Sequence, residues 1–190
     1  MAGSNPTTMN NFLTALGTQD LTTLVKQFCN DDVSGAYPIP CVAVTDHVVA
    51  NGPAFYGTKK VTKLFRRLFS AFPDVILTPL SPLNPLISAD LTTIGLQTTL
   101  KGTHQDWWFP PGDSDTYYSK PLSDIPPLGG AISIAACFVF TFNNSTNLIN
   151  QLAIYMDRYK FIKILAKGME TKLLSSSESF DEFRFRKEEI

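Results

Sequence analysis

The stretch "FYGTKKVTKLFRRLFSAFPD", residues 55–74, decides the fold class of this sequence. Apolar residues recur through it every three or four positions, which is typical of one buried helix face: Val61, Leu64, Phe65, Leu68, Phe69 and Phe72. The helix should begin at Thr58 and end before Pro73, because proline cannot continue a helix. Its opposite face carries lysines and arginines, which we interpret as a solvent-exposed face rather than an anion site.

Helical patterns precede this stretch, and strand patterns follow it. We expect a first helix that Thr7 or Thr8 caps and that ends at Gly17, and a second helix that Asp20 caps. Extended segments follow at residues 75–87, 92–105, 131–142 and 148–157. Because helices come first and hairpin-linked strands come after, the sequence predicts an α+β domain with helices on one face of a mostly antiparallel sheet.

Alternation along the strands indicates which side chains face inward. In residues 92–105 the even positions are mostly apolar and end at His104, so this histidine should point to the buried side of the sheet. Residues 131–142 are apolar at both parities, which predicts a central strand covered on both faces. One face of the last strand mixes small, aromatic and ionisable groups, as a pocket wall does: Ile149, Gln151, Ala153, Tyr155 and Asp157.

Composition and charge narrow the class of protein. The chain has 190 residues, which fits one domain with its own core, and 44% of them are hydrophobic. A formal net charge of −1 argues against a nucleic-acid interface. We find no apolar run of the ~20 residues that span a bilayer, and residues 1–12 lack a secretory signal pattern. We therefore expect a cytoplasmic protein that does not bind membranes.

Residues that hold metals and cofactors are sparse. The chain has two histidines, and Cys29, Cys41 and Cys137 lack the spacing of metal ligands. The stretch "PLGGA", residues 127–131, precedes a predicted strand rather than a helix, so it is not a phosphate-binding loop. We expect neither a metal nor a cofactor.

Several stretches, in this order along the chain, resemble the SnoaL-like polyketide cyclases of the nuclear transport factor 2-like superfamily. They are "FYGTKKVTKLFRRLFSAFPD" (55–74), "LKGTH" (100–104), "IPPLGGAISI" (125–134) and "LINQLAIYMD" (148–157). The resemblance implies a conical α+β barrel, in which a strongly curved sheet wraps around three N-terminal helices and encloses a cavity. Residues 1–168 would form this domain, an insertion at about 106–124 would be a lid, and residues 169–190 a polar, flexible tail.

The resemblance also implies two catalytic candidates. In the cyclases the aspartate that ends the last strand acts as an acid/base, and it corresponds to Asp157; the histidine of the GTH motif, here His104, lines the same pocket. A carboxylate in an apolar cavity has a raised pKa and can remove a proton next to a carbonyl. The family's Glu and Trp are replaced by Gln151 and Ala153, which should make the cavity roomier and less acidic.

Other side chains are candidates for substrate binding: Tyr155, Trp107, Trp108, Tyr37, Phe72 and Gln151. Structural alternatives stand beside these roles. Asp157 could instead bond to the backbone or to a surface cation, and His104 could be a core histidine with a satisfied hydrogen bond. The two tryptophans could pack the insertion onto the barrel or face a dimer partner.

Two hypotheses for function result. The first is a cofactor-independent enzyme, a cyclase, isomerase or dehydratase of secondary metabolism, doing acid–base chemistry on a hydrophobic, carbonyl-bearing, polyketide- or terpenoid-like substrate. The second is a non-catalytic module of the same fold that binds a ligand or mediates dimerisation. Family members commonly dimerise, so the resemblance implies a homodimer in either case.

Overall fold

The computed structural model describes residues 4–31, 39–46, 54–80, 85–106, 129–157, 160–161 and 163–164. Three helices precede most of the strands. The elements are α1 (Asn5–Gly17), α2 (Leu21–Val25), β1 (Cys41–Asp46), β2 (Ala54–Tyr56), α3 (Thr58–Ala71), β3 (Ile76–Pro79), β4 (Leu86–Ile87), β5 (Thr93–Thr103), β6 (Ala131–Phe142) and β7 (Ile149–Met156). None of the helices in these ranges is long and apolar enough to cross a membrane.

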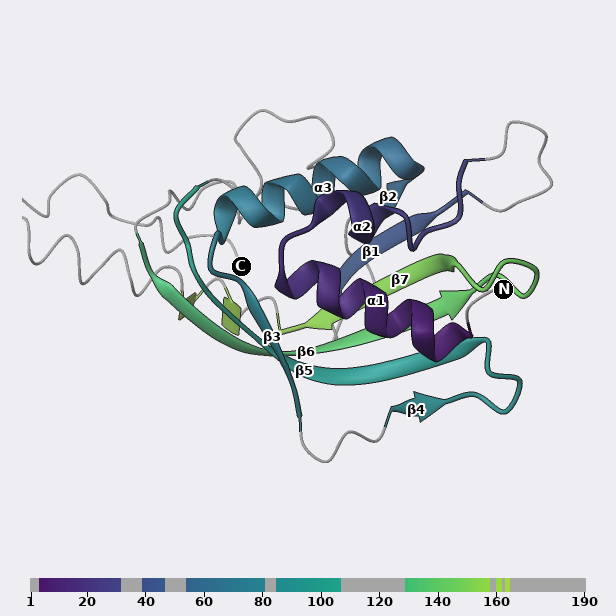
Figure 1. Ribbon diagram of the computed structural model, residues 1–190. Helices are drawn as coiled ribbons and strands as arrows, with labels where there is room; N and C mark the ends of the chain where they lie inside the picture. Colours follow the sequence, from purple (N-terminus) through teal and green to yellow (C-terminus); the bar gives the residue numbers. More distant parts are fainter. Residues whose placement is uncertain are drawn as a thin grey trace, which may run out of the picture.

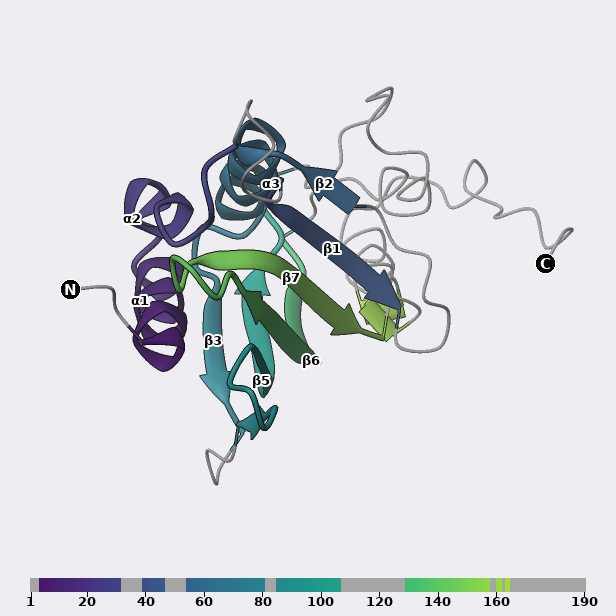
Figure 2. The same cartoon turned by 90° about the vertical axis from the view of Figure 1, so that its right-hand side faces the viewer.

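The strands form one curved, open sheet with all three helices on its concave side (Figure 1). The order is β2-β1-β7-β6-β5-β3, and β4 pairs with β5. Neighbours are antiparallel except β1 and β7, which run parallel. Turned by 90°, the molecule shows β1, β7 and β6 running side by side, with α3 above them and α1 and α2 to their left (Figure 2). The predicted α+β class, with a curved sheet around three N-terminal helices, is confirmed, although the sheet does not close.

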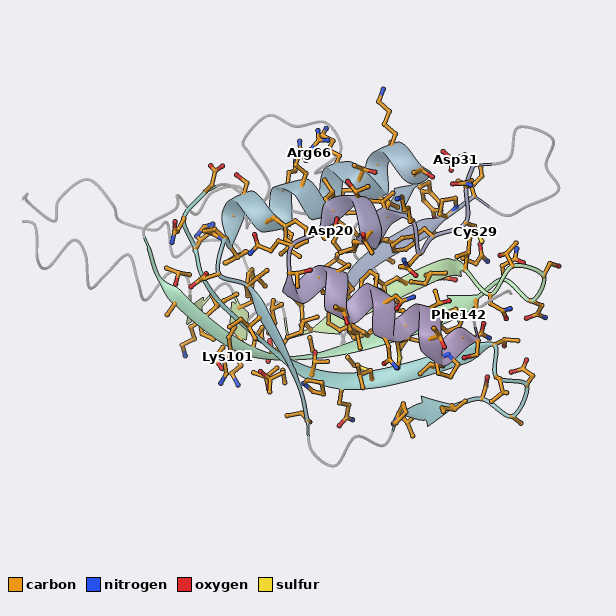
Figure 3. The ribbon with its side chains drawn as sticks, viewed as in Figure 1. Asp20, Cys29, Asp31, Arg66, Lys101 and Phe142 are labelled. Carbon is orange, nitrogen blue, oxygen red and sulfur yellow. The ribbon has the colours of Figure 1, made fainter. Side chains whose placement is uncertain are left out.

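Side-chain caps set the helix starts. Ser4, rather than Thr7 or Thr8, caps α1 and accepts a hydrogen bond from the Thr7 backbone N–H. Asp20 caps α2 as predicted, accepting from Thr23 N at 3.0 Å. At α3 the cap residue is a glycine without a side chain, and both Asp31 oxygens instead lie 3.1 Å from Thr58 N. Asp31 lies beside the start of that helix (Figure 3).

Strand β6 is buried on one face only, which corrects the prediction of a strand covered on both faces. Its even-numbered residues are buried, and Ala131, Ser133 and Ala135 on the other face are exposed. Alanine counts as apolar in the sequence pattern, yet it carries so little hydrophobic area that its exposure costs little. The long ladder with β5 therefore separates an apolar concave face from a convex face of small side chains.

Phenylalanines fill the concave side beneath α1. Phe12 contacts Phe140 edge to face with ring centroids 5.3 Å apart, and it contacts Phe28 and Phe65 at 5.9 and 5.8 Å. Phe142 extends this row on β6 and is labelled at the N-terminal end of α1 (Figure 3). Such edge-to-face pairs add to the hydrophobic burial that holds helices and sheet together.

Candidate functional site

The end of β5 and the end of α3 pack against each other, and this contact places His104. Phe72, which follows α3, stacks on the His104 ring with centroids 5.2 Å apart and planes 26° from parallel. Gly102 allows the approach, because a Cβ added there would lie 3.3 Å from Cβ of Phe72. The "FPD" and "GTH" motifs are therefore two halves of one contact, which we call the clasp: Phe72, Asp74, Gly102, Thr103 and His104.

Hydrogen bonds complete the clasp. Asp74 Oδ1 accepts from Thr103 N and Asp74 Oδ2 from the Thr103 hydroxyl, both at 2.6 Å. These bonds favour the carboxylate and lower the pKa of Asp74, the hydroxyl bond more than the backbone bond. The backbone N–H of Gln105 donates to the Ala71 carbonyl at 2.8 Å. The last turn of α3 thus fixes the point where β5 ends.

His104 is a buried imidazole, only 4% exposed, as the alternation along β5 predicted. Its backbone N–H donates to Gly130, and its carbonyl accepts from Gly129. Burial lowers the pKa of the ring, opposed by a hydrogen bond to the backbone of Asp106 and by the charge of Asp106. Because the pKa lies below its ordinary 6.5, the ring is neutral at neutral pH.

Asp157 follows β7 and begins a helical turn. It is half-buried, and its Oδ1 accepts from Lys160 N at 2.7 Å while its carbonyl accepts from Phe161 N. The turn brings the buried Phe161 ring to 6.2 Å from that of Phe72. Asp157 is therefore connected to the clasp through Phe161. Its side chain accepts a hydrogen bond from a backbone N–H, which is the structural role that the sequence left open as an alternative.

His104 and Asp157 are not joined directly. Met156 pairs with Ala136 on β6, whereas Thr103 pairs with Ala131, which lies five positions earlier on the same strand. At ~3.4 Å per residue this is roughly 17 Å of strand. Within the described residues neither side chain bonds to the other, and the aromatic pair Phe72–Phe161 lies between their elements.

The pocket-wall prediction for the last strand is wrong for Gln151 and Tyr155. The pairing between β6 and β7 shifts at Thr141/Phe142, so that Asn150 is an extra residue. This bulge places Gln151 opposite Thr141 and Tyr155 opposite Cys137, on the convex face. Leu152, Ile154 and Met156 point into the core instead.

The concave face of β5 carries one polar group that the sequence reading missed. Thr98 is fully buried, and its hydroxyl donates to the Ala136 carbonyl at 3.2 Å. The alternation along β5 could have predicted this burial, because residue 98 shares a face with the apolar Leu96 and Leu100. Phe72 is fully buried in the clasp. Tyr37, Trp107 and Trp108 lie outside the described residues, as do the predicted tail and residues 107–124 of the predicted insertion.

No metal centre is evident in the part of the chain that the structure describes, where no group of three or more His, Cys, Asp and Glu side chains is placed to hold an ion. Among the described residues, the polar groups near His104 include the carboxylates of Asp74 and Asp106 and the hydroxyls of Ser70 and Thr103, beside the imidazole itself. This set can exchange protons and form hydrogen bonds.

Solved structures with the same fold are numerous, although no family model matches the chain and no curated protein matches its sequence. A protein assigned as a SnoaL-like polyketide cyclase, from Jannaschia sp. CCS1, has a TM-score of 0.62 at 14% identity over 85% of this chain and 91% of its own. A phenazine biosynthesis-related protein from Pseudomonas aeruginosa has a TM-score of 0.60 at 15% identity, covering 85% and 80%.

A third similar structure is SalBIII, an epoxide hydrolase/cyclase-like enzyme of pyran ring formation in polyether salinomycin. Its TM-score is 0.56 at 11% identity, covering 82% of this chain and 92% of its own. At such low identity these likenesses establish the fold, which is that of the SnoaL-like polyketide cyclases, as the resemblance in sequence predicted. The reaction has to be argued from the site.

Proposed function

We propose that the protein is a cofactor-independent enzyme that binds a small hydrophobic, carbonyl-bearing molecule at the His104 end of the concave face. It acts there by proton transfer, as a cyclase, isomerase or dehydratase. Ring closure by aldol addition, double-bond migration and loss of water all begin with removal of a proton next to a carbonyl. The proposed substrates are polyketide- or terpenoid-like, because the buried rings of Phe72 and Phe161 next to His104 offer apolar contact.

The observation that carries this proposal is the neutral, buried His104. An imidazole with a lowered pKa is unprotonated at neutral pH and can take a proton. Ile94, Leu96 and Leu100 fill the same face with hydrocarbon, so His104 is a titratable group at the end of a largely apolar face. Perturbed titratable groups at the end of an apolar surface are candidates for function.

Asp157 is proposed as the second proton-transfer group. Its carboxylate lies at the start of the turn that carries Phe161 into contact with Phe72. A substrate that lies along this aromatic pair would bridge the gap between Asp157 and His104. The cyclase-like solved structures support the same type of chemistry without identifying its residues.

The proposal is tested with a bicyclic β,γ-unsaturated ketone, whose conversion to the conjugated enone is followed by ultraviolet absorbance. We expect turnover by the wild type and a loss of about 100-fold or more in His104→Gln and in Asp157→Asn. Thr98→Val is the matched control, because it removes a buried polar group from the same strand, six residues from His104. Full activity in both site variants would contradict the proposal.

A ligand-binding module without catalysis is the second candidate, and the clasp favours it. Packing of Phe72 against His104 and capping by Asp157 give both site residues a structural reason to be present. Such a module would bind the ketone and release it unchanged. Binding without turnover in the same experiment would identify this function.

We further propose that the convex face of the sheet joins two copies of the chain. Apart from Lys101, the outward residues of β5, β6 and β7 carry no charge, so the face can lie against itself in a two-fold dimer. Large apolar side chains extend it on β3 and β4, where Leu86 is 73% and Ile76 57% exposed. Lys101 projects from this side and Arg66 from the opposite side of the molecule (Figure 3).

Sedimentation measures the assembly directly. We expect the wild type to have the mass of a dimer and Val139→Glu that of a monomer, because the glutamate would be buried against its symmetry copy. Arg66→Glu changes charge on the exposed face of α3 and should leave the mass unchanged. A monomeric wild type would exclude the dimer.

A further inference from the structure

We infer that Asp106 and Ser70 fix the tautomer of His104, so that the ring nitrogen turned away from Asp106 is a proton acceptor and His104 is the general base. This inference rests on the proposed function and assigns a direction to proton transfer at its site. Asp106 and Ser70 are positioning residues here, since they act through the imidazole.

The hydrogen bond between the His104 ring and the Asp106 backbone determines where the ring carries its hydrogen. This bond favours the protonated ring, so the backbone group must be an acceptor, which is the carbonyl oxygen. The ring nitrogen on that side therefore carries the N–H. A neutral imidazole has one N–H and one lone pair, so the second nitrogen carries the lone pair. A lone pair can accept a proton from a substrate but cannot donate a hydrogen bond to an oxyanion.

Two bonds to the last turn of α3 hold the Asp106 carbonyl in place. The Ser70 hydroxyl donates to Asp106 Oδ2, and Gln105 N donates to the Ala71 carbonyl. Phe72 covers one face of the imidazole, so the ring has little freedom to turn over. Because a flip would exchange the two nitrogens, these contacts keep the lone pair on one side.

Among the described residues, the charge that acts on the ring is that of Asp106. Asp106 lies two residues beyond His104, and its charge raises the ring pKa against the larger effect of burial. Asp74 lies across the clasp, with its oxygens engaged by Thr103. The Asp106 carboxylate would stabilise the imidazolium that forms when His104 accepts a proton.

The proton-transfer step balances without a co-reactant. The lone pair of His104 takes the proton from the carbon next to the substrate carbonyl, and the electrons of the broken C–H bond pass to the carbonyl oxygen as an enolate. The imidazolium keeps its first N–H on the Asp106 carbonyl. In isomerisation it returns the new proton to the γ-carbon, which restores the neutral ring.

The experiment reads the tautomer by 15N NMR of the full-length protein, with His47→Gln used to assign the two histidines. We expect His104 to show one N–H nitrogen and one lone-pair nitrogen at neutral pH. Ser70→Ala should introduce the second tautomer and lower kcat roughly tenfold with little change in KM, because the base is misoriented while apolar binding remains. Ser88→Ala is the matched control, since it removes a serine–aspartate hydrogen bond elsewhere.

Asp106→Asn separates charge from orientation. It keeps the backbone carbonyl and removes the charge that raises the ring pKa, so the His104 pKa should fall while the tautomer stays the same. A wild-type ring that exchanges freely between tautomers would overturn the inference even if the ketone is converted. A single tautomer that Ser70→Ala leaves intact would overturn the role of Ser70. A single tautomer with no turnover would instead refute the proposed function and leave the tautomer assignment standing.

Discussion

The two ends of the concave face differ in what their side chains do. Beneath α1, Phe138, Phe140 and Phe142 of β6 form a stacked row, and Phe12 fits against its centre. At the other end of β6 the inward residues are Ile134 and Ile132, and the neighbouring strand ends at His104. The same two strands supply both ends, so the register that builds the aromatic core also determines where the imidazole lies.

One end of the β5–β6 ladder therefore contributes mainly to stability, and the other end carries the groups proposed for proton transfer. The aromatic end gains its free energy from burial and edge-to-face contacts, which are insensitive to pH. The clasp end depends on hydrogen bonds between a carboxylate and a threonine and on a titratable ring. Changes at the first end should therefore alter stability most, and changes at the second should alter activity, pH response and, to a smaller extent, stability.

Truncation at the aromatic end should have the largest effect. Phe140→Ala removes a fully buried ring that contacts Phe12 and stacks with both neighbours, so it should lower the free energy of unfolding by about 3–5 kcal/mol. Urea unfolding measures this change. In the surviving folded fraction the His104 pKa should be unchanged; a shifted pKa would mean that the two ends are coupled.

Replacement of His104 should have the next largest effect, and on activity rather than stability. His104→Gln should lower kcat for the ketone by ~100- to 10,000-fold, equivalent to about 3–5 kcal/mol of transition-state stabilisation, while Phe140→Ala retains kcat per folded molecule. Steady-state kinetics with urea unfolding on both variants tests this contrast. Equal losses of kcat in the two variants would remove the distinction between the ends.

Breaking the clasp at Asp74 should have an intermediate effect on stability. Asp74→Ala removes two bonds to Thr103 across 29 residues of chain and should lower the free energy of unfolding by about 1–2 kcal/mol. Asp90→Ala removes hydrogen bonds to Ser88 and Thr92. Because these partners are only two residues from Asp90, the bonds do not connect distant parts of the chain. This substitution should therefore cost less, and a larger loss in Asp90→Ala would contradict the role given to the clasp.

The smallest effect should be a pH dependence that only the clasp end produces. The folded-state pKa of His104 lies below 6.5, so the unfolded chain binds a proton first as pH falls, and stability should decrease from about pH 6.5 downward. The carboxylates of Asp20, Asp74 and Asp90, whose pKa values are lowered, remain ionised in this range. Urea unfolding at about pH 7.5 and pH 5.5 should show the loss in the wild type and in His47→Gln but not in His104→Gln.

Local patterns in the sequence were sufficient for much of this picture. Helical spacing predicted α3, alternation along β5 predicted that His104 points inward, and the bounds of β6 agree with the predicted segment. Each of these features depends on neighbours a few residues apart. The exposed side of β6 was mispredicted as buried because alanine counts as apolar without needing cover.

Features that depend on distant partners could not be predicted in the same way. The bulge at Asn150 is defined by its pairing with β6, and it turns Gln151 and Tyr155 to the convex face. The bonds from Asp74 to Thr103 and from Ser70 to Asp106 join residues about thirty positions apart. The FPD and GTH motifs are visible in the sequence, but only the curvature of the sheet brings the residues they contain into contact.

The central claim is that the His104 end of the concave face is a ligand site, and NMR titration with the β,γ-unsaturated ketone tests it most directly. We predict that the ketone shifts the ring resonances of His104 and Phe72 saturably, leaves those of Phe140 in place, and loses affinity in His104→Gln. Unchanged His104 resonances at saturating ketone, or equal shifts at both ends of the face, would contradict the account.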